Sequence, residues 1–158
     1  MMEVDIAQFI RKGGIHTGIE GSTPEEVLKN ACAVLPFPQS VSPDAFCNAL
    51  CAREEVMSTA IGNGIMLPHA SSPMLKEEEE QRIYVVYPKT PLDVKAMDGR
   101  KIYVMFILLT QNRNSHLNVL ASLQKLFSSQ NFRTLLEHGA EESVLLEAVR
   151  KETAEPSA

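Results

Sequence analysis

The run Ile102–Leu109 constrains the fold more than any other part of this 158-residue chain. It is uniformly apolar or aromatic, without the alternation of a strand that has one solvated face. A short continuous run of this kind predicts a central strand that is covered on both faces. The β-branched and aromatic run Ile83–Tyr87 predicts a second strand, and a turn at Met97–Arg100 separates the two. The sheet therefore needs helices on both sides.

Helix starts are clearest in the first third of the chain. Thr23 can cap the free amides of a helix in which Pro24 occupies the first turn and Glu26 completes a capping box. Ser42 and Pro43 predict a second start of the same kind. These two helices are expected to end near Val34 and near Glu54 or Glu55. The other expected elements are a helix around residues 4–10 stopped by Gly13-Gly14, a strand at Ile15–Ile19, a short strand stopped by Pro68, a helix from Ser115, and two further helices before residue 150.

Length and element order predict one domain. A chain of 158 residues can bury roughly two thirds of its unfolded surface in one core but is too short for two substantial domains. Helices before, after and around the strands, with no internal repeat, predict the α/β class. We expect a single-domain layered sandwich in which a mixed central sheet is flanked by helices, with the domain at residues 1–150 and a frayed tail at 151–158.

Charge and hydropathy exclude several classes of partner. A net charge of −5 leaves no surplus of cations for nucleic-acid phosphates. No basic leader precedes an apolar stretch, and no window approaches the roughly 18 apolar residues of a membrane span. We therefore expect a cytoplasmic protein with no nucleic-acid partner and no membrane insertion. Cys32, Cys47 and Cys51 are expected to be reduced thiols, and no metal is expected because they lack zinc-site spacing.

The residues that could carry chemistry are two histidines, an arginine and two hydroxyls. Signatures of P-loops, zinc proteases and serine hydrolases are absent from the sequence. The remaining candidate site residues are Arg53, Ser58, Thr59, His69 and His116. A neutral imidazole is a competent nucleophile near neutral pH, and a planar guanidinium with hydroxyl donors can hold a phosphoryl group. The set therefore suits phosphoryl transfer.

Each of these residues also has a purely structural interpretation. His69 follows Pro68 at a strand end, where a histidine is often structural, and His116 can be a hydrogen-bonding group alone. Arg53 can be a surface cation favoured by the C-terminal dipole of its helix. Met66 can fill a gap in the core. The pattern of residues alone leaves these alternatives open.

The segment Glu54–Ala70, EEVMSTAIGNGIMLPHA, resembles the phosphorylation-site signature of enzyme IIA domains of the bacterial sugar phosphotransferase system, mannitol/fructose class. The similarity extends to Asp98-Gly99-Arg100 before a hydrophobic strand, to Ser115-His116-Leu117 at a helix start, and to the order of elements over residues 3–150. The fold that the resemblance implies is the layered α/β sandwich expected above.

The resemblance also implies roles for the candidate residues. His69 would be the phosphorylated residue, His116 the second active-site histidine and Arg53 the phosphate-facing guanidinium, with Ser58 and Thr59 lining the same pocket. His69 would take its phosphoryl group from the small carrier protein HPr and pass it to a cysteine of a IIB domain, with no cofactor. The chain departs from the family at Met66, where the family usually has alanine, and at Ser71-Ser72-Pro73, where it commonly has arginine.

Three functions fit this resemblance. The favoured one is the stand-alone nitrogen-regulatory paralogue, in which the phosphorylation state of His69 governs binding to a regulated target. The alternative is a sugar-specific component that donates phosphate to a IIB cysteine during sugar uptake. The third is a non-catalytic binding module with the same fold. In the first two, the chain is a phosphotransferase component rather than an independent enzyme.

Overall fold

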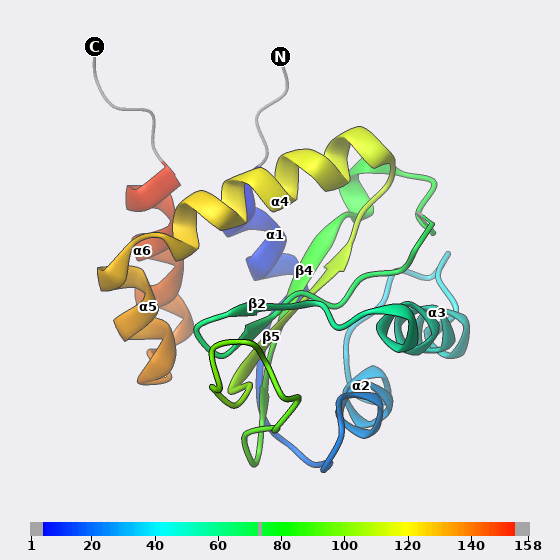
Figure 1. The fold of residues 1–158 in the computed structure, drawn as a ribbon. Helices are drawn as coiled ribbons and strands as arrows, with labels where there is room; N and C mark the ends of the chain where they lie inside the picture. The colour runs from blue at the N-terminus through cyan, green and yellow to red at the C-terminus, as the bar shows by residue number, and fades with distance from the viewer. Residues whose placement is uncertain (1–4, 73, 154–158) are drawn as a thin grey trace.

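A computed structural model describes residues 5–72 and 74–153, and its centre is a five-stranded mixed sheet (Figure 1). The strands are β1 (Ile15–Ile19), β2 (Ala60–Gly62), β3 (Ile65–Met66), β4 (Arg82–Pro88) and β5 (Val104–Leu109). Their order across the sheet is β1-β4-β5-β3-β2. The β1–β4 and β3–β5 pairs are parallel, whereas β4–β5 and β2–β3 are antiparallel.

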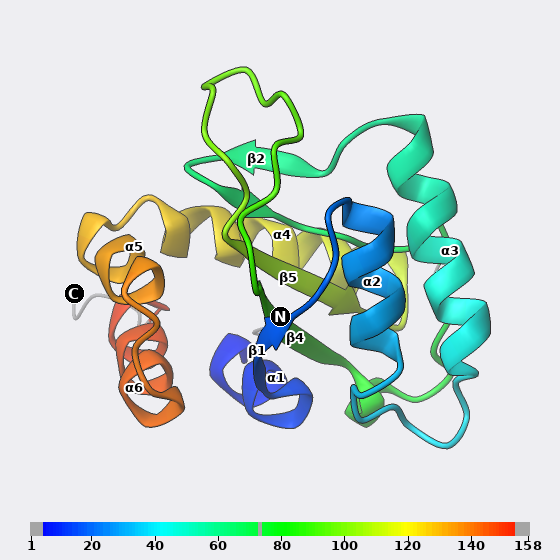
Figure 2. The same cartoon turned by 90° about the horizontal axis from the view of Figure 1, so that it is seen from below.

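Helices cover both faces of this sheet. One face carries α1 (Ile6–Gly13), α4 (Arg113–Phe127), α5 (Gln130–Glu137) and α6 (Glu142–Thr153), and the other carries α2 (Pro24–Cys32) and α3 (Pro43–Val56). Figure 2 shows α1, α5 and α6 on one side of the strands and α2 and α3 on the other. A 3₁₀ turn at Glu78–Glu80 precedes β4. The expected fold class, a mixed sheet flanked by helices, is confirmed.

The apolar run that dominates the sequence supplies the core of both layers. Every residue of β5 is buried, and successive side chains of a strand point to opposite faces. Phe106 accordingly packs in the cluster beneath α1, α4, α5 and α6, whereas Met105 and Ile107 pack in the cluster beneath α2 and α3. Met66 is fully buried in this second cluster, so its interpretation as a core residue is confirmed.

Local signals set the helix ends. The Thr23 hydroxyl accepts a hydrogen bond from the Glu26 amide at 3.2 Å, as predicted for the start of α2. The Glu26 carboxylate reaches back to the amide and hydroxyl of Ser22, one residue earlier than in a standard capping box. The Ser42 hydroxyl caps α3 by accepting from the Ala45 amide.

The structure differs from the sequence predictions at several places. Helix α4, which is predicted to start at Ser115, begins at Arg113 because Asn112 caps it. The strand predicted at Ile102–Leu109 begins at Val104, because Ile102 instead forms an isolated bridge with Leu92. Strand β2 was not predicted, since three residues carry too little periodicity to reveal it. Helix α6 continues through Lys151 to Thr153, so these three residues are helical rather than frayed. Residues 154–158 of the predicted tail lie outside the described residues.

Within the described ranges, none of the helices combines the length and the apolar character that crossing a membrane requires.

Candidate functional site

A cavity of about 560 Å³ lies where four parts of the fold meet. The segment that follows β3 contributes His69, the end of β5 contributes Thr110, and the first turn of α4 contributes His116. Arg53, from the last turn of α3, also lines it. The structure therefore brings together three of the five predicted site residues, which are separated by up to 63 positions in the sequence (116 − 53 = 63).

The sheet holds His69 in place. Its backbone forms a parallel bridge with Leu108, whose amide donates to the Pro68 carbonyl at 2.9 Å. The ring is half-buried, and its Nδ1 lies 2.8 Å from the carbonyl oxygen of Leu67. A carbonyl oxygen can only accept, so Nδ1 carries the proton and donates it. In the neutral ring the lone pair is then on Nε2.

His116 lies beside His69, with the two ring centroids 4.7 Å apart. Its helix is capped by Asn112, whose side chain accepts from the Ser115 amide at 2.9 Å. Nδ1 of His116 is 3.3 Å from the hydroxyl of Thr110. Burial, and then repulsion from His69, lower the pKa of His116 from 6.5 to about 4. His116 is therefore neutral at physiological pH.

Arg53 combines the two interpretations that the sequence left open. It stands in the last turn of α3, where a cation interacts favourably with the helix dipole. Its Nη1 donates to the carbonyl of Met57, just beyond the helix, at 2.7 Å. The same side chain lines the cavity with His69. One edge of the guanidinium is thus used structurally, while the residue still contributes positive charge to the cavity.

Ser58 and Thr59, in contrast, are not among the described residues that line the cavity. The Thr59 hydroxyl donates to the buried carboxylate of Glu54 at 2.7 Å, and its amide donates to the same group at 2.9 Å. The Ser58 hydroxyl is exposed and accepts from the Ala60 amide. Both residues connect the end of α3 to β2, and the pocket role implied for them by resemblance does not match their contacts.

The structure adds residues that the sequence analysis missed. Arg113, Thr110, Ser71 and Ser72 also line the cavity. Arg113 is the first residue of α4 and precedes His116 by three positions, so the two share a helix face. The signal that could have found it is the Asn112 cap, which fixes where the first turn begins. In the part of the chain that the structure describes, no cluster of three His, Cys, Asp or Glu residues is placed to hold a metal ion.

The fold and this cavity define a small α/β domain built around a pair of adjacent histidines. Residues 8–152 match the family described as "Phosphoenolpyruvate-dependent sugar phosphotransferase system, EIIA 2", and the chain belongs to this family. The resemblance seen in the sequence is thereby confirmed.

The relatives include both sugar-specific and nitrogen regulatory proteins. A nitrogen regulatory protein of Bradyrhizobium diazoefficiens is 30% identical over 130 residues, covering 80% of this chain and 82% of the relative. The fructose-specific EIIABC component of Bacillus subtilis is 27% identical over 144 residues, covering 89% of this chain. The matched region is only 22% of the length of that larger protein. The nitrogen regulatory protein IIA-Ntr of Neisseria meningitidis superposes with a TM-score of 0.72 at 25% identity, covering 85% of this chain and 92% of that structure.

Proposed function

We propose that the chain is a phosphocarrier in which His69 accepts a phosphoryl group from the phosphohistidine of an HPr-type protein in the cytoplasm. The observation that carries this proposal is the hydrogen bond from Nδ1 of His69 to the Leu67 carbonyl. It fixes the tautomer, so that the lone pair of the neutral ring is on Nε2. A half-buried imidazole with a fixed ring and a free lone pair is suited to nucleophilic attack on phosphorus.

The bonds and electrons of the transfer balance without uptake or release of a proton by His69. The lone pair on Nε2 forms the new P–N bond while the donor's P–N bond breaks, and that electron pair returns to the donor ring. His69 keeps its Nδ1 proton, so the phosphorylated ring gains positive charge, which the Leu67 carbonyl stabilises. In onward transfer to a cysteine thiolate of a IIB-type partner, the P–N bond breaks, its electrons return to Nε2, and a P–S bond forms.

The remaining cavity residues stabilise charge rather than form bonds. His116 is neutral, so it can donate one ring N–H to a phosphoryl oxygen without a costly buried cation. Arg53 supplies permanent positive charge on the cavity wall. Phosphoryl transfer depends mainly on such positioning and charge stabilisation.

A regulatory role is the favoured form of this function. The chain matches most of the length of two proteins named as nitrogen regulatory, 82% and 92% respectively. We propose that the phosphorylation state of His69 selects whether a regulated target binds. The alternative is a sugar-specific IIA that donates to a IIB cysteine, and the match to one part of a fructose-specific EIIABC component supports it.

The test is phosphorylation by purified components. The chain is incubated with phosphoenolpyruvate, enzyme I and HPr, and intact mass is recorded for wild type and His69→Ala. We expect a phosphate-sized, acid-labile gain in wild type only. No gain in wild type, with active upstream proteins, would leave a IIA-like binding module and reject the carrier function. Adding candidate IIB proteins then separates transport from regulation, since only a transport component passes its phosphate to a IIB cysteine.

A further inference from the structure

The cavity carries a second arginine whose position the fold does not explain. Arg113 is the first residue of α4 and is exposed, and it lines the cavity with His69 and His116. A cation in the first turn opposes the helix dipole, which favours negative charge at this end. Arg53 stands at the favourable end of its helix. The two arginines of the cavity therefore differ in what the fold gains from them.

The surroundings of Arg113 offer no compensation for this placement. Neither a side-chain hydrogen bond nor an ion pair joins its guanidinium to the rest of the described chain, where the ion pairs are Lys89–Glu20 and Arg100–Glu137. Its sequence neighbours Gln111, Asn112, Asn114 and Ser115 are uncharged. A residue that opposes the local electrostatics without an intramolecular gain marks a functional position.

The cavity itself indicates the missing partner. Its described lining contains two arginines and no aspartate or glutamate. Two formal positive charges without a carboxylate suit a dianion, and a guanidinium presents donors in the fork geometry that phosphate oxygens accept. Arg53 already donates one nitrogen to the Met57 carbonyl, whereas the donors of Arg113 have no described acceptor.

We propose that Arg113 is a phosphate-binding residue, which pairs with the phosphoryl group at His69 and, with Arg53, forms a two-arginine dianion site. The proposal rests on the function proposed above for His69. The division of labour follows from the contacts: Arg53 is anchored on the end of α3, and Arg113 reaches the phosphoryl group from the start of α4.

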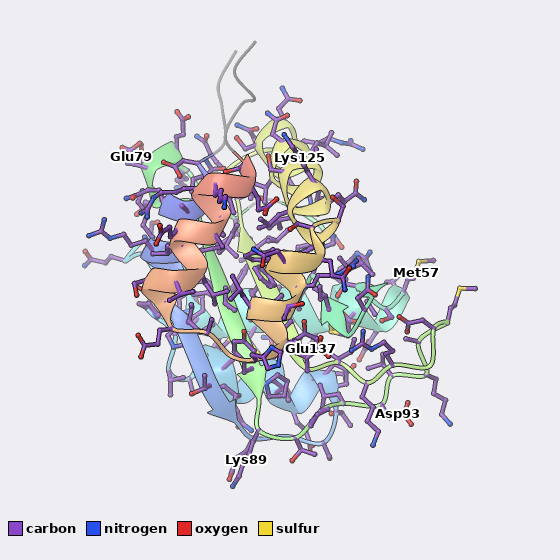
Figure 3. All side chains as sticks on the ribbon, turned by 90° about the vertical axis from the view of Figure 1, so that its left-hand side faces the viewer. Met57, Glu79, Lys89, Asp93, Lys125 and Glu137 are labelled. Carbon is purple, nitrogen blue, oxygen red and sulfur yellow. The ribbon has the colours of Figure 1, made fainter. Side chains whose placement is uncertain are left out.

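The first test measures binding of inorganic phosphate by NMR titration of the His69 and His116 ring signals. Arg113→Gln should weaken binding about tenfold, the loss of one charge-assisted contact at an open site. Arg113→Lys should recover part of the affinity. Lys125→Gln removes an exposed cation from the other end of the same helix (Figure 3) and should change affinity by less than about twofold. Equal affinity in Arg113→Gln and wild type, or phosphate that leaves both rings unperturbed, overturns the proposal.

The second test measures the rate of transfer from phosphorylated HPr to each variant, alongside unfolding in urea. Arg113→Gln should slow transfer about tenfold without lowering stability, which a merely structural residue would not do. Equal transfer rates in wild type and Arg113→Gln would reject the role of Arg113 and keep the carrier function. Arg113-dependent phosphate binding without any transfer from HPr in wild type would reject the carrier function and keep the dianion site.

Discussion

The two histidines of the cavity differ in how their protons are held. Nδ1 of His69 donates to a main-chain carbonyl, so its tautomer is set by the backbone. Nδ1 of His116 faces the hydroxyl of Thr110, which can donate or accept. His116 can therefore change its tautomer while His69 cannot. The fixed ring suits the acceptor of a phosphoryl group, and the adaptable ring suits a hydrogen-bond donor to that group.

The lowered pKa of His116 predicts an acid-dependent loss of stability. Its pKa is about 4 in the folded protein and near 6.5 when exposed. Between these values the unfolded chain binds more protons, so the stabilisation present above pH 6.5 is lost as the pH falls towards 4. We expect the free energy of unfolding to fall by about 1 kcal/mol over this range, since the ring is only half-buried and solvent screens its charge. Urea unfolding at pH 7 and pH 4.5 should show a smaller acid loss in His116→Gln, and equal losses would contradict this account.

Thr59 is expected to stabilise the fold rather than to bind phosphate. Thr59→Val removes the donor to the buried Glu54 carboxylate and should cost about 1–3 kcal/mol of unfolding free energy. Phosphorylation of His69 should continue. Ser58→Ala is the control, because this exposed hydroxyl accepts one local hydrogen bond and its loss should cost about 0.5 kcal/mol. Urea denaturation and intact mass measure the two effects, and a Thr59→Val protein of full stability that no longer accepts phosphate would restore the pocket role.

At the scale of elements, the β2–β3 hairpin leads the chain to His69. Its turn uses left-handed backbone at Asn63 (φ 56°) and Gly64 (φ 78°). Asp98 fixes the turn from outside, since its carboxylate accepts from the Asn63 amide at 2.8 Å. The Asp98 carboxylate also accepts from the Arg100 amide, at 3.1 Å. The hydrogen bonds from the amides of Arg100 and Asn63 lower the pKa of Asp98. The Asp98-Gly99-Arg100 turn seen in the sequence therefore supports the hairpin.

Gly64→Ala should be strongly destabilising. An added Cβ would lie 2.7 Å from a ring carbon of Tyr103 and 2.9 Å from the Lys101 carbonyl oxygen. The left-handed backbone at this position disfavours alanine as well. We expect a loss of about 3 kcal/mol. Gly99→Ala is the matched control, because its φ is 71° but nothing lies within 4 Å of the new Cβ, and about 1 kcal/mol should be lost. Thermal and urea unfolding of the two variants give the comparison, and equal losses would show that the close contact at Gly64 is relieved without cost.

The elements that the sequence predicts well are those with strong local signals. The caps at Thr23 and Ser42 and the apolar run in β5 each encode their element within a few residues. The short strand β2 pairs with its hairpin partner β3, and β3 is held in the sheet by its parallel pairing with β5, a contact distant in the sequence that no local window contains. Ile102 is as apolar as the strand it precedes, and only its bridge to Leu92 shows where the strand begins.

The candidate site was predicted in part for the same reason. His69 and His116 belong to motifs, Arg53 directly precedes the first of them, and the fold places all three at one cavity. Ser58 and Thr59 belong to the same motif as His69, but the Ser58 hydroxyl bonds to the Ala60 amide and the Thr59 hydroxyl to the Glu54 carboxylate. Sequence proximity does not determine the direction of a side chain. Arg113 has no motif, and its relation to His69 depends on how α4 lies against the sheet.

At the scale of the whole molecule, the central strands belong to two cores at once. Val85 packs beneath α1 and α4, and its neighbour Val86 packs beneath α2 and α3. A layer cannot lose its core without exposing strands that the other layer needs. We therefore expect the domain to unfold in one cooperative transition.

Val85→Ala and Val86→Ala test this expectation as a matched pair, since both side chains are almost completely buried. Each should lower the free energy of unfolding by about 2 kcal/mol. In each variant, far-UV circular dichroism and tyrosine fluorescence should report the same urea midpoint. Separate midpoints in either variant would show that the two layers unfold independently.

The attachment of His69 to the sheet also sets the range over which its state can be read. The bridge to Leu108 fixes where a phosphoryl group would stand, and such a group adds about two negative charges at that point. At physiological salt, the effect of an exposed charge is largely screened beyond about 8 Å. A protein that distinguishes the two forms must therefore cover the mouth of the cavity, which is also where the donor must bind. Under the proposed function, the phosphoryl donor and the protein that distinguishes the two forms cannot bind at the same time. An abundant donor therefore delays binding of that protein to the phosphorylated form that the donor has just produced.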